Sequence, residues 1–144
     1  MGDELYPQND RHGIAPYQAA PDEVYMNPAQ EAHFQAILQA WRRELMEEVD
    51  RTVDHMKVDS GQHPDPNDRA SQESDMDMEL RTRERERRLL GKIEKTLKKI
   101  DEHEYGYCVQ CGVEIGIRRL EARPTAELCI DCKTKQEAHE QLHG

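Results

Sequence analysis

The sequence predicts a mainly α-helical protein in which a long antiparallel helical hairpin is joined to a small region organised by four cysteines. Three observations support this fold class. Apolar residues recur at steps of three and four on both sides of the segment His63–Ala70. Pro64 and Pro66 within that segment prevent one continuous helix, so the chain must turn there. Two Cys-x-x-Cys pairs follow the second helical pattern.

The composition argues against a large globular core. The chain has 144 residues with one Phe and one Trp, and 35% of its residues are charged. The formal net charge of −10 makes the chain as a whole a poor non-specific nucleic-acid binder, because phosphate contacts need an excess of Lys and Arg. No apolar run approaches the roughly 20 residues of a membrane span, and the N-terminus lacks a signal-peptide pattern. We therefore expect a cytoplasmic protein with reduced thiols and no membrane partner.

The first helix has a clear predicted start. Residues 1–27 contain three prolines and no sustained period, so we expect an irregular N-terminal segment, partly packed on the globular base. Asn27 can cap the helix, Pro28 suits its first position, and Gln30 stands where a capping-box partner would. Asp59-Ser60-Gly61 ends it. Its apolar stripe consists of Phe34, Ile37, Leu38, Trp41, Leu45, Val49, Val53 and Met56.

The second helix begins at Asp65-Pro66 or near Asp68. Residues 28–103 are therefore predicted as an antiparallel coiled-coil hairpin with its tip near residues 61–70. Because the apolar stripes of the two helices cover each other within one hairpin, we expect a monomer. The stripe of the second helix consists of Met76, Leu80, Leu90, Ile93, Leu97 and Ile100.

Charge is segregated along the second helix. Residues 59–79 carry seven acidic residues against Arg69 alone, whereas residues 80–100 carry nine basic residues against three glutamates. Asp65 and Asp68 are most simply interpreted as capping residues at the start of a helix. The alternative is that the tip presents their carboxylates to a metal ion or to basic groups. The basic run is either a solvated, glutamate-paired face or a site for a phosphorylated ligand. Nothing local decides between these alternatives.

Four cysteines have the spacing of a zinc site. Cys108 and Cys111 form one Cys-x-x-Cys pair, Cys129 and Cys132 form another, and 17 residues separate the pairs. Four protein ligands leave no position for a reactive water, so we expect one structural zinc ion per chain. Free thiols, disulfides and a thioredoxin-like redox pair are the alternatives.

The region after residue 103 completes the predicted fold. Val113–Leu120 and Thr125–Leu128 are short β-compatible runs, and Asp131–Leu142 is rich in helix formers. We therefore predict that residues 104–144 form a four-cysteine zinc-finger domain with a short β-hairpin and a C-terminal helix. His139 and His143 lack a third ligand and are interpreted as surface residues.

Three motifs together resemble the DksA/TraR zinc-finger family of RNA polymerase-binding transcription factors. They are Asp65–Ala70 (DPNDRA), Gly106–Gly112 (GYCVQCG) and Glu114–Leu120 (EIGIRRL). The Asp-x-x-Asp-x-Ala tip pattern and the four-cysteine set are both complete, and the resemblance covers nearly the whole chain from about Tyr17.

The resemblance implies a regulator of transcription that is not an enzyme. In such a regulator, the hairpin enters the secondary channel of bacterial RNA polymerase and places Asp65, Asp68 and Ala70 near its catalytic centre, without reading DNA sequence. Promoter open complexes change in stability, so that ribosomal RNA promoters are repressed and some amino-acid biosynthesis promoters activated in the stringent response. The resemblance also implies that guanosine tetraphosphate acts as effector in the polymerase complex, at positions matched here by Arg85, Leu89, Lys92 and Lys133.

Three other hypotheses compete with this one. A transcript-cleavage or elongation factor would use the tip carboxylates to hold a catalytic Mg²⁺, and would cleave a backtracked transcript. A zinc-dependent thiol oxidoreductase would show disulfide reductase activity while zinc-loaded. A structural coiled-coil adaptor explains the hairpin but not the charge segregation.

Overall fold

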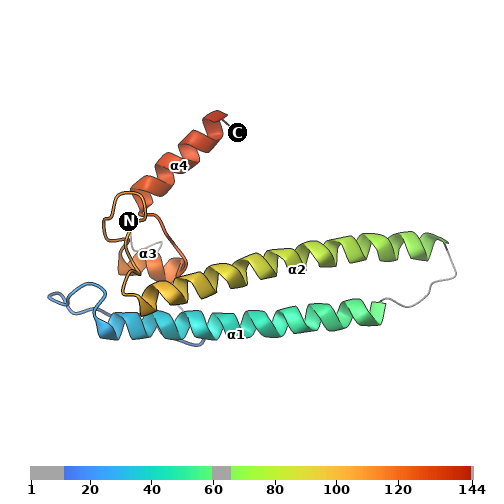
Figure 1. The fold of residues 1–144 in the computed structure, drawn as a ribbon, viewed down its shortest axis with the longest axis horizontal. Helices are drawn as coiled ribbons and strands as arrows, with labels where there is room; N and C mark the ends of the chain where they lie inside the picture. The colour runs from blue at the N-terminus through green and yellow to red at the C-terminus, as the bar shows by residue number, and fades with distance from the viewer. Residues whose placement is uncertain (1–11, 60–65, 144) are drawn as a thin grey trace. The chain divides into compact units, whose positions relative to one another are not determined.

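The computed structural model describes residues 12–59 and 66–143 and is mainly helical (Figure 1). Within these residues no extended strand is present, and Tyr107 and Glu114 form an isolated antiparallel bridge. None of the helices described there is long and apolar enough to cross a membrane. The four helices are α1 (Pro28–Asp59), α2 (Pro66–Asp101), α3 (Ile117–Ala122) and α4 (Ile130–His143).

The helices divide between two compact units. One unit contains the chain up to Ala40 and from Lys95 onward, and the other is Trp41–Glu94. In each unit a part of α1 lies antiparallel beside a part of α2, which is consistent with the predicted coiled-coil hairpin (Figure 1). The predicted segmentation into residues 1–27, 28–103 and 104–144 stays a prediction.

The start of α1 follows the predicted capping scheme with one difference. The side chain of Asn27 accepts a hydrogen bond from the Gln30 N–H at 2.9 Å, as an N-cap residue does. The Gln30 side chain reaches back one residue further than expected, to the Met26 N–H at 2.6 Å. Gln30 is 1% exposed, so this reciprocal cap is part of the packed interior.

The core of the first unit is built from the start of α1, the end of α2 and the cysteine-containing region. Tyr105 is 1% exposed; its ring centroid lies 5.6 Å from that of Phe34, and its hydroxyl donates to the Pro124 carbonyl at 2.8 Å. Phe34 and Tyr105 are about 70 positions apart in the sequence, so their contact helps to fix the tertiary arrangement of this unit. Its fully or nearly buried apolar side chains are Phe34, Ile37, Leu38, Ile100, Tyr105, Ile115 and Leu120.

The unit Trp41–Glu94 has a smaller core. Leu45 and Ile93 are buried, as their places in the apolar stripes predict. Leu80, counted in the stripe of the second helix, is instead 48% exposed. Val53 and Met56 have side chains outside the described residues. Trp41, Val49, Met76 and Leu90 are half-buried, and Leu97 is half-buried in the first unit.

The two β-compatible runs contain less β structure than predicted. Ile117–Ala122, most of it inside the first run, is the helix α3, and Thr125–Leu128 contains no strand. The predicted β-hairpin is reduced to the Tyr107–Glu114 bridge. Burial explains α3, because one helical turn places Leu120 and Glu121 together in the interior, both 0% exposed.

The N-terminal segment is attached to this core by hydrogen bonds. The Tyr17 N–H donates to Glu121 Oε1 at 2.8 Å, and the same oxygen lies 2.5 Å from His33 Nε2. The Glu23 carboxylate accepts hydrogen bonds from the Tyr17 hydroxyl and from Asn27 Nδ2. These hydrogen bonds, that of Tyr17 first, lower the pKa of Glu23 to about 2, so the group is ionised at neutral pH.

Truncation of Phe34 is expected to destabilise the protein. Phe34 is fully buried, so Phe34→Ala leaves a cavity and should lower the free energy of unfolding by about 3–5 kcal/mol. Guanidinium unfolding of the zinc-loaded protein, followed by circular dichroism, measures this change. The control is Val24→Ala at a side chain that is 73% exposed, with an expected change within about 0.5 kcal/mol. Equal effects of the two variants would refute the assignment of Phe34 to the core.

Candidate functional site

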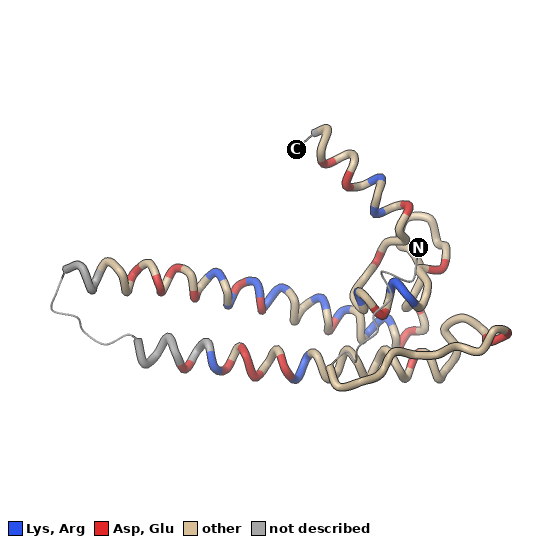
Figure 2. The backbone as a smooth tube through the Cα atoms, turned by 180° about the vertical axis from the view of Figure 1, so that it is seen from behind, with Lys and Arg blue, Asp and Glu red and all other residues tan. Residues whose placement is uncertain are grey.

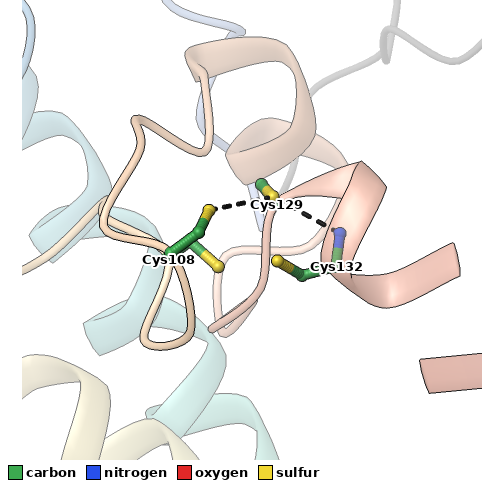
Figure 3. Close-up of side chains that lie close together, drawn as sticks. Cys108, Cys129 and Cys132 are labelled. Carbon is green, nitrogen blue, oxygen red and sulfur yellow. Dashed lines mark hydrogen bonds between the residues drawn. The ribbon is translucent and has the colours of Figure 1, made fainter. Parts of the chain in front are cut away.

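The structure brings the four predicted cysteines together. Cys108 and Cys111 come from the turn after α2, and Cys129 and Cys132 flank the start of α4. Their four sulfur atoms all lie within 4.8 Å of one another. Figure 3 shows the side chains of Cys108, Cys129 and Cys132 converging on one region.

The sulfur distances fit a metal site and not disulfides. Cys111 Sγ and Cys129 Sγ are 3.7 Å apart, whereas a disulfide bond is about 2.05 Å long. All four cysteines are free. A tetrahedral zinc ion with Zn–S bonds of about 2.3 Å needs sulfur atoms about 3.8 Å apart. The donor set and its spacing therefore suit a closed, four-thiolate zinc site.

The local electrostatics also favour a cation. Burial raises the pKa of the Cys108 thiol, but backbone N–H groups, that of Cys129 first, outweigh it and lower the pKa to about 6. The pKa of Cys132 rises to about 12, because its hydrogen bond with Cys129 and then burial favour the neutral thiol. The Cys108 thiolate thus forms readily while ionisation of Cys132 beside it is opposed, and a bound cation would favour the thiolate form of both.

Backbone hydrogen bonds hold the two cysteine pairs in place. The Gly112 N–H donates to the Cys108 carbonyl at 2.9 Å and closes the first turn. The Val109 N–H donates to the Glu127 carbonyl at 2.9 Å and joins the first pair to the loop of the second. Arg119 of α3 donates through Nε to the Leu128 carbonyl at 2.9 Å. The loop before Cys129 is therefore fixed from two sides.

Glu127 also connects that loop to the hairpin. Its Oε1 lies 3.5 Å from Lys95 Nζ and 3.8 Å from Lys99 Nζ, both on α2. These groups are partly exposed, so each pair contributes little by itself. Their geometry nevertheless places one acidic side chain of the cysteine-containing loop against two lysines of the hairpin.

The structure describes only part of the predicted tip. Asp65 lies outside the described residues. Asp68 is in the first turn of α2, with its side chain outside them, and Ala70 is exposed. Their proposed role is therefore not tested by this geometry.

The predicted nucleotide positions lie on two helices. Arg85 and Lys92 are exposed and Leu89 is half-buried; their spacing of four and seven residues places them on one face of α2. Lys133 is in the first turn of α4, with Nζ 3.3 Å from the Gln136 side-chain oxygen. Figure 2 shows the predicted change of sign along α2, from acidic residues toward the tip to basic residues beyond them.

Sequence reasoning missed the long-range contacts between the N-terminal part of the chain and the cysteine-containing region. The Tyr25 hydroxyl donates to the Gly106 carbonyl at 2.7 Å, and burial raises the pKa of Tyr25 to about 12, which keeps the phenol protonated. Glu121 pairs with His33 across 88 positions. The available signal was weak: glycines flank the Cys108-containing turn, and single aromatic and acidic residues occur far away in the sequence.

Family models match most of the chain. The DksA N-terminal domain model (DnaK suppressor protein DksA) matches residues 30–100, and the prokaryotic dksA/traR C4-type zinc-finger model matches residues 103–138. The second match and the four close sulfur atoms support a structural zinc ion.

Curated relatives and a solved structure agree with these matches. The chain is 62% identical over 128 residues to the RNA polymerase-binding transcription factor DksA of Escherichia coli K12, covering 89% of this chain and 85% of the relative. It is 57% identical over 131 residues to the protein of that name from Haemophilus influenzae, covering 91% and 90%. The structure of transcription factor DksA2 from Pseudomonas aeruginosa matches with a TM-score of 0.80 and 37% identity, covering 84% and 93%. The family has no catalytic role. The chain therefore belongs to the DksA/TraR family of transcription factors, with a DksA N-terminal domain followed by a C4-type zinc finger.

Proposed function

We propose that this protein is a non-enzymatic transcription regulator that binds bacterial RNA polymerase through the secondary channel and alters the stability of promoter open complexes. The observation that carries the proposal is the 62% identity to an RNA polymerase-binding transcription factor, spread over 89% of the chain. Its repertoire would include repression of ribosomal RNA promoters and activation of some amino-acid biosynthesis promoters. It would act as a monomer in the cytoplasm, the compartment of its partner.

The tip residues Asp65, Asp68 and Ala70 are proposed to act near the polymerase catalytic centre. The sequence around them holds seven acidic residues between 59 and 79 against one arginine. A negatively charged tip suits a basic cleft that contains Mg²⁺, because carboxylates are strong partners of both. The protein would not read DNA sequence, because a net charge of −10 disfavours the phosphate contacts that would hold it on DNA.

Zinc is proposed to have a structural role, with Cys108, Cys111, Cys129 and Cys132 as its ligands. A closed set of four thiolates leaves no open coordination position for substrate or water. When bound, the ion supplies a cross-link between the turn after α2 and the start of α4. The protein groups then orient this cross-link through the backbone hydrogen bonds described above.

Guanosine tetraphosphate is proposed to act as effector at the interface with polymerase, through Arg85, Leu89, Lys92 and Lys133. Arg85 and Lys92 present two cations on one face of α2, with the apolar Leu89 between them. Lys133 adds a third cation from α4. Guanidinium and ammonium groups are the usual protein partners of phosphates.

The experiment that tests this function is the lifetime of a ribosomal promoter open complex formed with purified bacterial RNA polymerase. We expect the protein to shorten the lifetime and guanosine tetraphosphate to deepen the effect. An unchanged lifetime in all conditions would refute the proposal. Cleavage of a backtracked transcript, assayed in parallel, would instead indicate a cleavage factor.

Removal of a phosphate-binding cation should change only the nucleotide-dependent part of the effect on open-complex lifetime. Arg85→Ala or Lys92→Ala should raise the nucleotide concentration for half-maximal effect by roughly tenfold or more, because each loses a charge-assisted contact to phosphate. The matched control is Arg87→Ala, which removes one exposed cation from the opposite face of α2. An equal loss of nucleotide response in Arg87→Ala would point to general electrostatics rather than a defined site.

A further inference from the structure

The turn that carries the first two cysteines is a small antiparallel hairpin. We call residues 105–116 the knuckle. Its two arms pair through the Cys108 N–H, which donates to the Val113 carbonyl at 2.8 Å, and through the Tyr107–Glu114 bridge. An isolated pair of such short arms is marginally stable by itself, so its geometry depends on what holds the open end.

A tyrosine from the N-terminal segment holds that open end. The Ile115 N–H donates to the Gly106 carbonyl at 2.8 Å, which is the last backbone hydrogen bond between the arms. Beyond it, the Tyr25 hydroxyl donates to the same Gly106 carbonyl at 2.7 Å and accepts from the Gly116 N–H at 3.1 Å. One hydroxyl thus bridges the two arms where direct backbone pairing stops.

The contact is close and specific. Gly106 has a φ of +95°, and a Cβ atom there would lie 2.9 Å from the Tyr25 hydroxyl oxygen and 2.8 Å from Met26 Cε. Only glycine allows the backbone to adopt this φ and approach the tyrosine so closely. The Tyr25 ring also meets the Tyr107 ring edge-on, with centroids 5.6 Å apart and an interplanar angle of 82°.

The position of Tyr25 is set by the start of α1. The next residue, Met26, donates its N–H to the buried Gln30 side chain at 2.6 Å, inside the reciprocal cap of the helix. Asn27, the N-cap residue, is held in turn by Glu23 at 2.8 Å. The hydroxyl therefore reaches the knuckle from a support that contains none of the four cysteines.

We propose that Tyr25 is a positioning residue of the metal centre, whose hydroxyl joins the two arms of the knuckle and slows the release of zinc. Release requires Cys108 and Cys111 to move away from Cys129 and Cys132. The hydrogen bonds of Tyr25 to Gly106 and Gly116 tie the knuckle to the N-terminal segment and resist this opening of the site. Loss of the hydroxyl leaves the Gly116 N–H without this acceptor and lowers the resistance to opening. The inference rests on the structural zinc assigned above.

Zinc transfer from the loaded full-length protein to an excess of a chromogenic chelator tests the proposal. We expect Tyr25→Phe to accelerate release on the order of tenfold, the usual size of an effect from a residue that supports metal ligands. The d–d and sulfur-to-metal bands of the Co²⁺-substituted protein should retain tetrahedral character, since all four ligands remain. In the wild type, the Gly116 amide should be protected from hydrogen exchange, a measurement that needs no variant.

A variant with the same chemical change serves as the control. Tyr107 is 40% exposed and its ring contacts that of Tyr25, so Tyr107→Phe removes a neighbouring hydroxyl. This variant should release zinc within about twofold of the wild-type rate. Wild-type release from Tyr25→Phe, equal acceleration by Tyr107→Phe, or an unprotected Gly116 amide would each overturn the role of Tyr25. A wild-type protein without stoichiometric zinc would overturn the zinc assignment as well, and the two failures are thereby distinguished.

Discussion

Replacement of Asp68 by Asn is expected to abolish the effect of the protein on open-complex lifetime while leaving its fold and its binding to polymerase nearly unchanged. Asp68 lies in the first turn of α2. Asn has nearly the same volume and caps helices about as well as Asp, so a capping role alone would survive the change. What the substitution removes is the negative charge that the tip is proposed to present to the polymerase active-centre region. Lifetimes and polymerase binding should be measured on the same preparations.

The matched control for Asp68→Asn is Asp77→Asn. Asp77 is exposed on the same helix and loses the same charge, but it lies outside the Asp-x-x-Asp-x-Ala motif. We expect wild-type lifetimes with this variant. If Asp68→Asn instead loses polymerase binding together with its effect, the residue supports the structure of the tip. If Asp77→Asn is equally inactive, the net charge of the acidic segment, and not the motif, determines activity.

The elements that were predicted correctly are those encoded by local sequence. The Asn27–Gln30 cap, the first helical position of Pro28 and the end of α1 near Asp59 depend on residues within a few positions of each other. The cysteine cluster was equally accessible, because a tetrahedral metal site restricts the spacing within each Cys-x-x-Cys pair. In both cases the physical constraint acts over a short stretch of chain.

The elements that were missed depend on contacts between distant residues. Helix α3 replaces a β-compatible run because burial of Leu120 and Glu121 outweighs the local propensity of residues such as Ile117. The Tyr25 bridge joins positions 81 and 91 residues apart, and Glu121 joins His33 across 88. No periodicity in a single sequence reports such pairs. Leu80 shows the reverse error, since it fits the apolar stripe but is 48% exposed next to a run of charged residues.

Removal of zinc is expected to unfold the cysteine-containing region while most of the hairpin stays helical. The region after residue 103 buries few apolar side chains, so metal binding must supply much of its folding free energy, on the order of 10 kcal/mol for comparable small zinc sites. The unit Trp41–Glu94 contains none of the four cysteines and keeps its own contacts, including Leu45 and Ile93. Helices α3 and α4 have 6 and 14 residues against 32 and 36 in α1 and α2, so ellipticity should fall by about a quarter or less. Hydrogen exchange should rise at Cys108–Ile115 and stay slow near Ile93.

A pair of variants at Cys111 separates loss of metal from loss of a cysteine. Cys111 is exposed, so a larger side chain has room there. Cys111→Ser removes a ligand and should reproduce the effect of the chelator, whereas Cys111→His offers a three-cysteine, one-histidine set that zinc also accepts and should retain metal and structure in part. If chelation left ellipticity, melting and exchange unchanged, the ion would not be structural. The core around Phe34 and Tyr105 would then have to hold the cysteine turn without the ion. We do not expect this, because the knuckle consists of two short arms joined at their open end by one tyrosine hydroxyl, and such a hairpin is marginally stable.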